Sequence, residues 1–219
     1  MKVHRLIPCA LALTVLAASA SLAQSPASPA APASPASPAP PSGFRGEFLA
    51  QQDNVEKEIL GLAEATPADK YGWRPAPGVR SVSEVFIHIV GGNYLFGGYT
   101  GMKPPTPMDM PSMAAMEKNV TEKAKVIEEL KKSFVYLRAG VAALPDADLD
   151  KPVKFFGRDF TVRGVLLIGA NHEHEHLGQS IAYARMNGIT PPWAAEQARQ
   201  MKEMMEKMEK KPAPAPAAK

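Results

Sequence analysis

Asn171-His172-Glu173-His174-Glu175-His176-Leu177-Gly178-Gln179 is the stretch that decides the fold, and it holds three of the chain's five histidines. It lies within Val165 to Ala184, a mainly apolar segment without proline that we predict to be a helix. Each helical residue turns by about 100°, so His172 and His176 share one face, one turn apart. Two imidazoles so placed can bind one metal ion, because neutral imidazole is the commonest metal ligand.

Alternatives to a shared metal ion remain open for this pair. A lone histidine on an apolar face is commonly a core residue with its own polar partner. His172 and His176 fall on the stripe of Val165, Ile168 and Tyr183, and a shared metal would satisfy both imidazoles at once. A strand would instead align His172, His174 and His176. The long apolar surroundings and the helix stop at Gly188 favour the helix.

The other polar residues of this stretch have less specific roles. His174 points away from the pair in a helix, so we expect a surface or packing residue. Glu173 and Glu175 are expected to be solvated rather than to bind metal. Gln179 lies about one turn beyond His176, where it either orients a ligand or makes a hydrogen bond within the protein.

A second predicted helix supplies a third imidazole. Ser81-Val82-Ser83-Glu84 has the Ser-x-x-Glu spacing of a capping box, so a helix should begin at Ser81 and run to about Tyr99. His88 is its only histidine and points into the core or to its edge. Three imidazoles from two helices leave coordination positions open, as is typical of a catalytic rather than a structural metal site.

The remaining patterns complete an all-α four-helix bundle over residues 43–192. Apolar stripes predict two more long helices, and a predicted cap at Thr161 starts the helix that ends at Asn187-Gly188. Charged residues, among them Glu117, are expected to lie on the solvent-exposed surface of the bundle. The other expected segments are helices at Phe44 to Ala65 and Thr121 to Leu144, a connection at Asp69 to Arg80 packed down by Tyr71 and Trp73, a loop at Gly97 to Pro111 and a hairpin-like piece at Lys154 to Phe160.

Residues 193–219 are predicted to form a short, charged, Met-rich extra helix at Ala194 to Lys211, followed by a disordered tail. Its methionines, Met201, Met204, Met205 and Met208, have helical spacing. We expect this apolar stripe to lie on the bundle. A copper site is an alternative, because thioethers favour Cu(I), and a docking surface for a partner is another.

The N-terminal region predicts export. Residues 1–23 have the charged, apolar and small-residue parts of a signal peptide, and the apolar run is short for a membrane anchor. Residues 24–42 are a Pro/Ala/Ser repeat, which we interpret as a disordered linker. Cys9 is the only cysteine, so a periplasmic or secreted mature chain would have no disulfide and no membrane anchor.

Net charge argues against a nucleic-acid partner. The formal charge of +3 falls to +1 once Lys2 and Arg5 are removed with the signal peptide. A nucleic-acid-binding domain would be expected to show a basic stripe.

Three blocks together carry a family resemblance: ATPADKYGWRP at residues 65–75, SVSE leading to His88, and HEHEHLGQ with YARMNGI at residues 172–189. Over Phe44 to Pro192 the chain resembles the DinB-like (damage-inducible) family of metal-binding four-helix bundles. The resemblance implies an up-down bundle with unusual connections, often a homodimer. It also implies a divalent metal, commonly zinc or nickel, on three histidines that match His88, His172 and His176. Some relatives are thiol-dependent transferases or isomerases, although most look cytoplasmic and this chain carries an export signal.

Three functions follow as hypotheses. The first is a metal-dependent hydrolase or transferase acting on a small molecule of unknown identity, with catalytic residues beyond the metal ligands unassigned. The second is a non-catalytic metal or small-ligand binding bundle in the periplasm. The third is an interaction protein that docks through the Met-rich helix.

Overall fold

The computed structural model describes residues 43–209, so the predicted signal peptide, linker and final tail lie outside the described residues. Within this range the chain is mainly helical, as expected for an all-α fold. The long elements in chain order are α1 (Gly43–Ala65), α2 (Val82–Gly98), α3 (Met110–Asn119), α4 (Lys123–Ala143), β1 (Pro152–Phe155), β2 (Arg158–Thr161), α5 (Val162–Met186) and α6 (Ala194–Glu209). Short 3₁₀ turns lie at Ala68–Lys70 and Asp146–Asp148.

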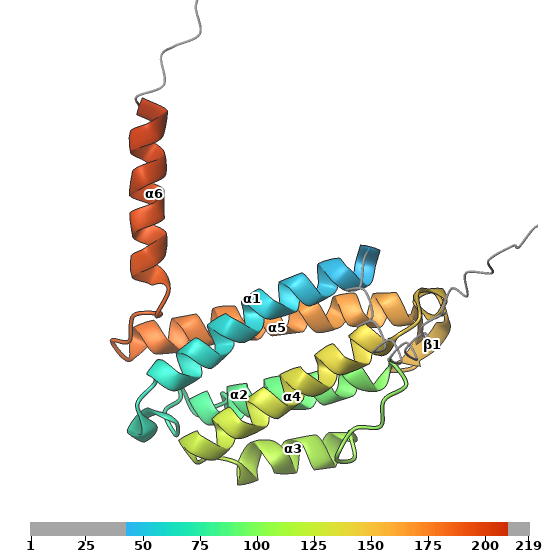
Figure 1. Cartoon of the computed structure of the whole chain (residues 1–219). Coiled ribbons are helices and arrows are strands. Elements are labelled where there is room, and N and C mark those ends of the chain that lie inside the picture. The colour runs from blue at the N-terminus through green and yellow to red at the C-terminus, as the bar shows by residue number, and fades with distance from the viewer. Residues whose placement is uncertain (1–42, 210–219) are drawn as a thin grey trace, which may run out of the picture. The chain divides into compact units, whose positions relative to one another are not determined.

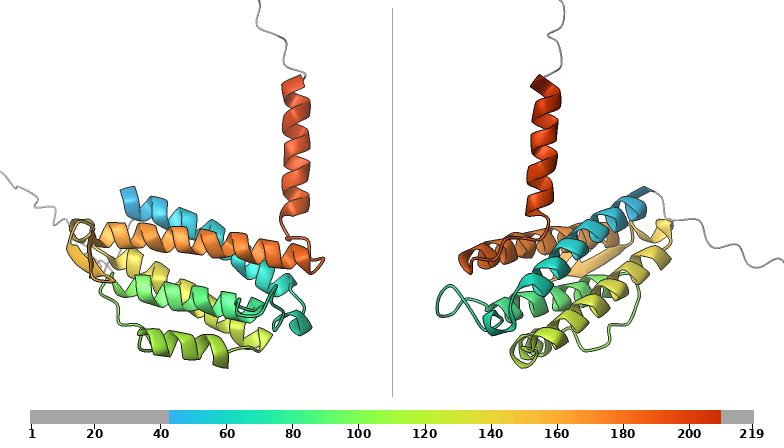
Figure 2. Two further views of the ribbon diagram at one scale, coloured as in Figure 1. Left: turned by 180° about the vertical axis from the view of Figure 1, so that it is seen from behind. Right: turned by 60° about the vertical axis from the view of Figure 1, so that its left-hand side comes forward.

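Four helices form the bundle, in which α1 and α2 each pack against both α4 and α5. Helices α2 and α4 run in the same direction, whereas α1 and α5 run in the opposite one (Figure 1). This arrangement depends on α3, which carries the chain back along the outside of α2 before α4 begins (Figure 2). The insertion of α3 is therefore what makes the connection between two parallel helices.

Helix starts follow the predicted capping residues. The Ser81 hydroxyl accepts from the Glu84 amide while the Glu84 carboxylate accepts from the Ser81 amide, which completes the capping box. Thr161 accepts from the Gly164 amide at the start of α5. These two caps set where α2 and α5 begin. They thereby help to set the positions along the two helix axes at which the histidines face each other.

The core consists of the predicted apolar stripes. Fully buried side chains include Ile59 and Leu62 of α1, Phe86 of α2, Phe134 of α4 and Leu166 of α5. The connection after α1 is packed down as expected: the Tyr71 hydroxyl donates to the Ala63 carbonyl at 2.7 Å, and the Trp73 ring meets Tyr183 edge-on. Burial of these rings and branched side chains is the main source of stability.

The predicted loop is present over residues 99–109, but the helix that follows it was not predicted, and the expected outward position of Glu117 is wrong. Residues 110–119 form α3, with the Asp109 carboxylate capping the Ser112 amide and Pro111 in the first turn. Because α3 packs along α2, Glu117 faces the bundle, with its side chain only 12% exposed. The hairpin is present as β1 and β2, joined at Phe156 and Gly157.

The expected solvation of Glu173 is wrong. Its side chain is fully buried between α5 and α1, where Gln52 Nε2 donates to Glu173 Oε2 at 2.6 Å. Burial raises the pKa of this carboxyl to about 8, and the hydrogen bond from Gln52 only partly offsets the rise. Glu173 lies seven residues after Leu166 and seven before Ser180, both buried, so it belongs to the stripe of α5 that faces α1.

The methionine stripe of α6 is not packed as expected. Met201, Met204, Met205 and Met208 are 50–69% exposed. The rest of α6 from Glu196 to Met208 is also exposed, and its charges pair within the helix, as between Arg199 and Glu196. Among residues 43–209, no helix has the length and apolarity that crossing a bilayer requires.

Candidate metal centre

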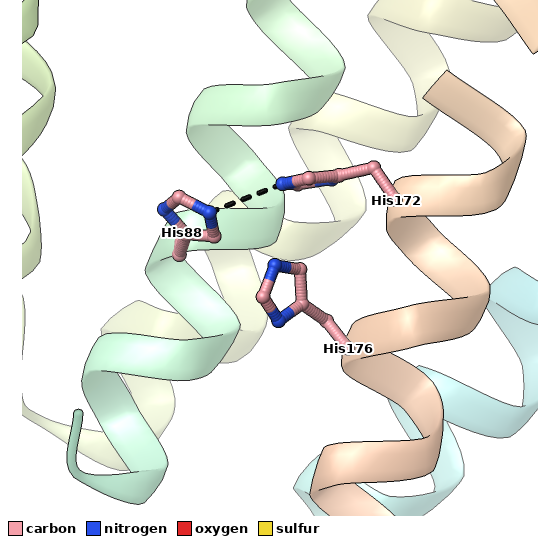
Figure 3. A group of neighbouring side chains, drawn as sticks. All are labelled: His88, His172 and His176. Carbon is pink, nitrogen blue, oxygen red and sulfur yellow. Dashed lines mark hydrogen bonds between the residues drawn. The ribbon is translucent and has the colours of Figure 1, made fainter. Parts of the chain in front are cut away.

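The three predicted imidazoles meet at the interface of α2 and α5. His88 projects from α2, and His172 and His176 project from successive turns of α5, with their rings converging (Figure 3). One nitrogen from each ring lies within 4.8 Å of the other two. The Nε2 atoms of His88 and His172 are 3.1 Å apart. Nitrogens that share one tetrahedral zinc at 2.0–2.1 Å lie about 3.3 Å apart, so this pair already has ligand spacing.

Two of the imidazoles are oriented by partners at Nδ1. His88 Nδ1 lies 2.7 Å from Glu117 Oε1, and Arg80 Nε donates to Glu117 Oε2 at 2.8 Å. His176 Nδ1 lies 2.8 Å from Gln179 Oε1. Carboxylate and amide oxygens accept hydrogen bonds, so both Nδ1 atoms carry the proton. In both rings Nε2 therefore carries the lone pair that a metal ion could take.

The partners are themselves fixed in place. Gln179 Nε2 donates to the Tyr183 hydroxyl at 3.0 Å, which sets the amide oxygen toward His176. The Tyr183 hydroxyl donates to the Arg80 carbonyl at 3.2 Å. A hydrogen-bonded chain thus runs from His176 to the residue that holds Glu117, and it links the orienting groups of two ligands.

The protonation states suit metal binding. Burial, together with the smaller effects of the neighbouring His176, His88 and Arg80, lowers the pKa of His172 to about 3. Burial also lowers the pKa of His176, against the opposing hydrogen bond of Gln179. For Glu117, burial would raise the carboxyl pKa, but hydrogen bonds from His88 and Arg80 outweigh it and lower the pKa. At neutral pH the cluster therefore combines the neutral imidazoles of His172 and His176 with an ionised carboxylate.

On its Nδ1 side, the His172 ring is held by steric contact and not by a hydrogen bond. Its ring lies against Gly92 of α2, where a Cβ would come within 2.6 Å of His172 Cε1. His172 Nδ1 is buried and has no hydrogen-bond partner among the described residues. Because His88 carries its proton on Nδ1, its Nε2 accepts a hydrogen bond from the Nε2–H group of His172. A metal ion at both Nε2 atoms would move that proton to His172 Nδ1.

A cavity of about 380 Å³ reaches the cluster. His88, His172, Arg80 and Glu117 form its polar part, and the rest of its lining is apolar. His176 is not among the residues that line it. A ligand in this cavity would therefore approach the site from the side of His88 and His172.

The other predicted roles are resolved by the same geometry. His174 is exposed and its Nδ1 lies 2.9 Å from its own helix carbonyl at Ala170, so it is separate from the cluster. Glu175 is exposed as expected, and Gln179 makes the hydrogen bond expected of it. The roles of Glu117 and Arg80 at the site were not predicted, because charged residues in such surroundings normally lie on the protein surface. An Asp-Met-Pro start followed by apolar spacing at Met113 and Met116 was the available signal for the α3 helix.

The donor set fits a divalent metal. It offers three imidazoles, two of them with orienting hydrogen bonds at Nδ1, and leaves room for a further ligand from the cavity. Zinc and nickel both accept such nitrogen ligands, so the set does not distinguish between them.

Comparison with known proteins points to one family. The model described as the DinB superfamily matches residues 51–180. Uncharacterized protein YjoA of Bacillus subtilis (strain 168) is 28% identical over 149 residues, which span 63% of this chain and 84% of YjoA.

Two solved structures share the fold. The DinB-like protein of Bacillus cereus ATCC 10987 superposes with a TM-score of 0.58 at 22% identity, covering 66% of this chain and 93% of that one. The DinB-like protein YjoA of Bacillus subtilis gives a TM-score of 0.50 at 24% identity, covering 67% and 92%.

Proposed function

The chain belongs to the DinB superfamily, and we propose that its three-histidine cluster binds one divalent metal ion whose remaining coordination position is open to a small molecule. The single observation that supports this is the convergence of His88, His172 and His176 beside a cavity. Zinc and nickel are the proposed metals. The expected reaction class is metal-dependent hydrolysis or group transfer.

The chain's own residues have defined tasks in this function. Glu117 and Gln179 hold the Nδ1 protons of His88 and His176 and so orient both rings. Gly92 lets His172 approach α2, and the cavity beside the cluster has mainly apolar walls against which a small molecule can pack. A divalent metal bound there would supply Lewis acidity and lower the pKa of a bound water or thiol.

A non-catalytic binding bundle is the second candidate, and one observation favours it. Among the described residues that line the cavity, Glu117 is the only carboxylate, and it is already engaged by His88 and Arg80. Among the described lining residues, no carboxylate is therefore free to act as a general base. Turnover of ester, amide or thiol-transfer substrates by the metal-loaded protein would decide for the enzyme, and its absence across such panels would decide for the binding bundle.

Elemental analysis of the purified full chain tests the metal site. We expect about one divalent ion per chain, and loss of that ion in His88→Ala, His172→Ala and His176→Ala. His174→Ala is the matched control, since this histidine lies on the same helix but outside the cluster, and it should keep the metal. Full retention in all three cluster variants would disprove the site.

Export and assembly complete the proposal. We propose that residues 1–23 direct the chain to the periplasm or outside the cell and that the mature protein carries no nucleic-acid or membrane partner. N-terminal sequencing of protein recovered from cell fractions tests the first point. Light scattering of the purified protein tests whether it forms a homodimer.

A further inference from the structure

We propose that the cavity beside His88 and His172 is a binding chamber for a small anionic amphiphile, with its head at the histidine cluster and its apolar body against the walls. This inference rests on the proposed metal site. The volume of about 380 Å³ lies within the range of small-molecule sites.

The walls come from every element around the cluster. Leu95 and Phe96 belong to α2, Met113 to α3, Phe155 to β1 and Ile168 to α5. Such a surface gains free energy from contact with methylene or aromatic groups, because it removes apolar area from water. Polar substrates such as sugars would leave most of their hydroxyl groups without partners here. The body of the ligand is therefore apolar.

The rim adds two exposed apolar side chains. Phe156 and Met110 are 70% and 67% exposed, and both line the cavity from opposite elements, the hairpin and α3. Phe156 also has a φ of 47°, a conformation that bulky side chains rarely adopt. An exposed aromatic ring held in a strained turn at a cavity mouth is typical of a ligand contact rather than of fold stabilisation.

A divalent cation on the cluster would favour an anionic head. Arg80 neutralises Glu117 through their 2.8 Å contact, so the two together contribute little net charge. A divalent cation on the three imidazoles would make the region positive. A carboxylate or another monoanionic head would therefore be attracted to this end of the chamber.

A homologous series of alkanoates tests the chamber. Hexanoate, octanoate and decanoate are titrated into the zinc-loaded full chain by calorimetry, with octan-1-ol as the neutral control. We expect affinity to rise about fourfold per added methylene until the chamber is full. Octanoate should bind more tightly than octan-1-ol. Equal affinities along the series would overturn the apolar chamber, and equal binding of the acid and the alcohol would overturn the anionic head.

Two neighbouring alanines of α3 provide a matched pair of variants. Ala114 lines the cavity and Ala115, the next residue, does not. Ala114→Phe should reduce octanoate affinity at least tenfold, whereas Ala115→Phe should leave it unchanged. Equal effects of the two substitutions would contradict the chamber.

Zinc content measured on the same samples separates this inference from the metal site. Full zinc occupancy with no dependence on chain length overturns the chamber alone. The opposite result is also informative. If the protein contains no zinc but its octanoate affinity still depends on residue 114, the metal site is disproved and the apolar chamber is retained.

Discussion

The ring of His172 rests directly on Gly92, so close that a single methyl group on residue 92 would lie 2.6 Å from His172 Cε1 and 2.9 Å from Nδ1. This contact fixes the side of the His172 ring that carries Nδ1, which has no hydrogen-bond partner among the described residues, while Nε2 faces His88.

Gly92→Ala should therefore damage the metal site more than the fold. The new Cβ displaces the His172 ring, and we expect zinc affinity to fall at least tenfold, as measured by competition with a coloured chelator. Gly178→Ala on α5 is the control, because a Cβ there meets nothing within 4 Å. Unchanged zinc affinity in Gly92→Ala would contradict the role of this contact.

Glu117→Gln should weaken zinc binding by about 10- to 100-fold. Glu117 orients His88 by accepting a hydrogen bond from Nδ1, and a neutral amide oxygen accepts this hydrogen bond less strongly than a carboxylate does. Isothermal titration measures the change. Glu128→Gln, an exposed substitution on α4, should have no effect. Equal zinc affinity of the two variants would show that Glu117 does not position His88.

Glu84 should make stability depend on acid pH. Burial would raise its pKa, but hydrogen bonds from Lys118, the Ser81 amide and Arg74 outweigh burial and hold the pKa at about 2. A carboxyl whose folded pKa is depressed stabilises the fold fully above its unfolded pKa, near 4.5, and loses this contribution as pH falls toward 2.

Glu84→Gln should accordingly lower the free energy of unfolding by about 2–3 kcal/mol at pH 7, with the difference shrinking below about pH 4.5. Urea unfolding at several pH values measures it. Glu47→Gln, at an exposed position of α1 with no ion pair among the described residues, serves as the control, and a difference that stays constant from pH 7 to pH 3 would argue against the pKa shift.

Glu173→Gln should stabilise the protein near neutral pH. The buried carboxyl has a raised pKa, so folding costs free energy once the pH exceeds the unfolded value near 4.5, and the cost grows until about pH 8. The amide removes this cost and should add about 1–3 kcal/mol at pH 8 but little at pH 4. Glu175→Gln, two residues along and exposed, should leave thermal unfolding nearly unchanged. A lower melting temperature of Glu173→Gln at pH 8 would contradict this prediction.

Phe156→Asn should lower the affinity for the ligand and raise the stability of the fold. Asparagine tolerates a positive φ better than phenylalanine, so the turn with Gly157 relaxes and the free energy of unfolding should rise by about 1 kcal/mol. Octanoate affinity should fall, because an aromatic contact at the rim is lost. Thermal unfolding and calorimetry measure the two effects, and a variant that binds octanoate as well as the parent would remove Phe156 from the site.

Much of the fold was predictable because long apolar periodicity and caps act locally. The starts of α2 and α5 follow from Ser81 and Thr161, and the face shared by His172 and His176 follows from helical geometry. The convergence of His88 on that pair needed only the packing of two helices. Local patterns were sufficient there because each histidine sits in a long, well-capped helix.

The polar groups that complete the site were harder to predict. Glu117 and Glu173 stand among other charges, and nothing local separates a carboxylate that faces a neighbouring helix from one that faces water. Their burial depends on α3 lying along α2 and on α1 lying along α5. The exposure of the α6 methionines likewise depends on packing that spacing alone does not reveal.

Helix α3 supplies Met110, Met113 and Glu117 to the site, yet none of its residues is fully buried. Its detachment exposes less apolar surface than that of any bundle helix, so it belongs to the part of the fold that opens most easily while α1, α2, α4 and α5 stay packed. Entry of an ion or a ligand can therefore follow a local opening of α3, and amide hydrogen exchange along residues 110–119 measures that opening.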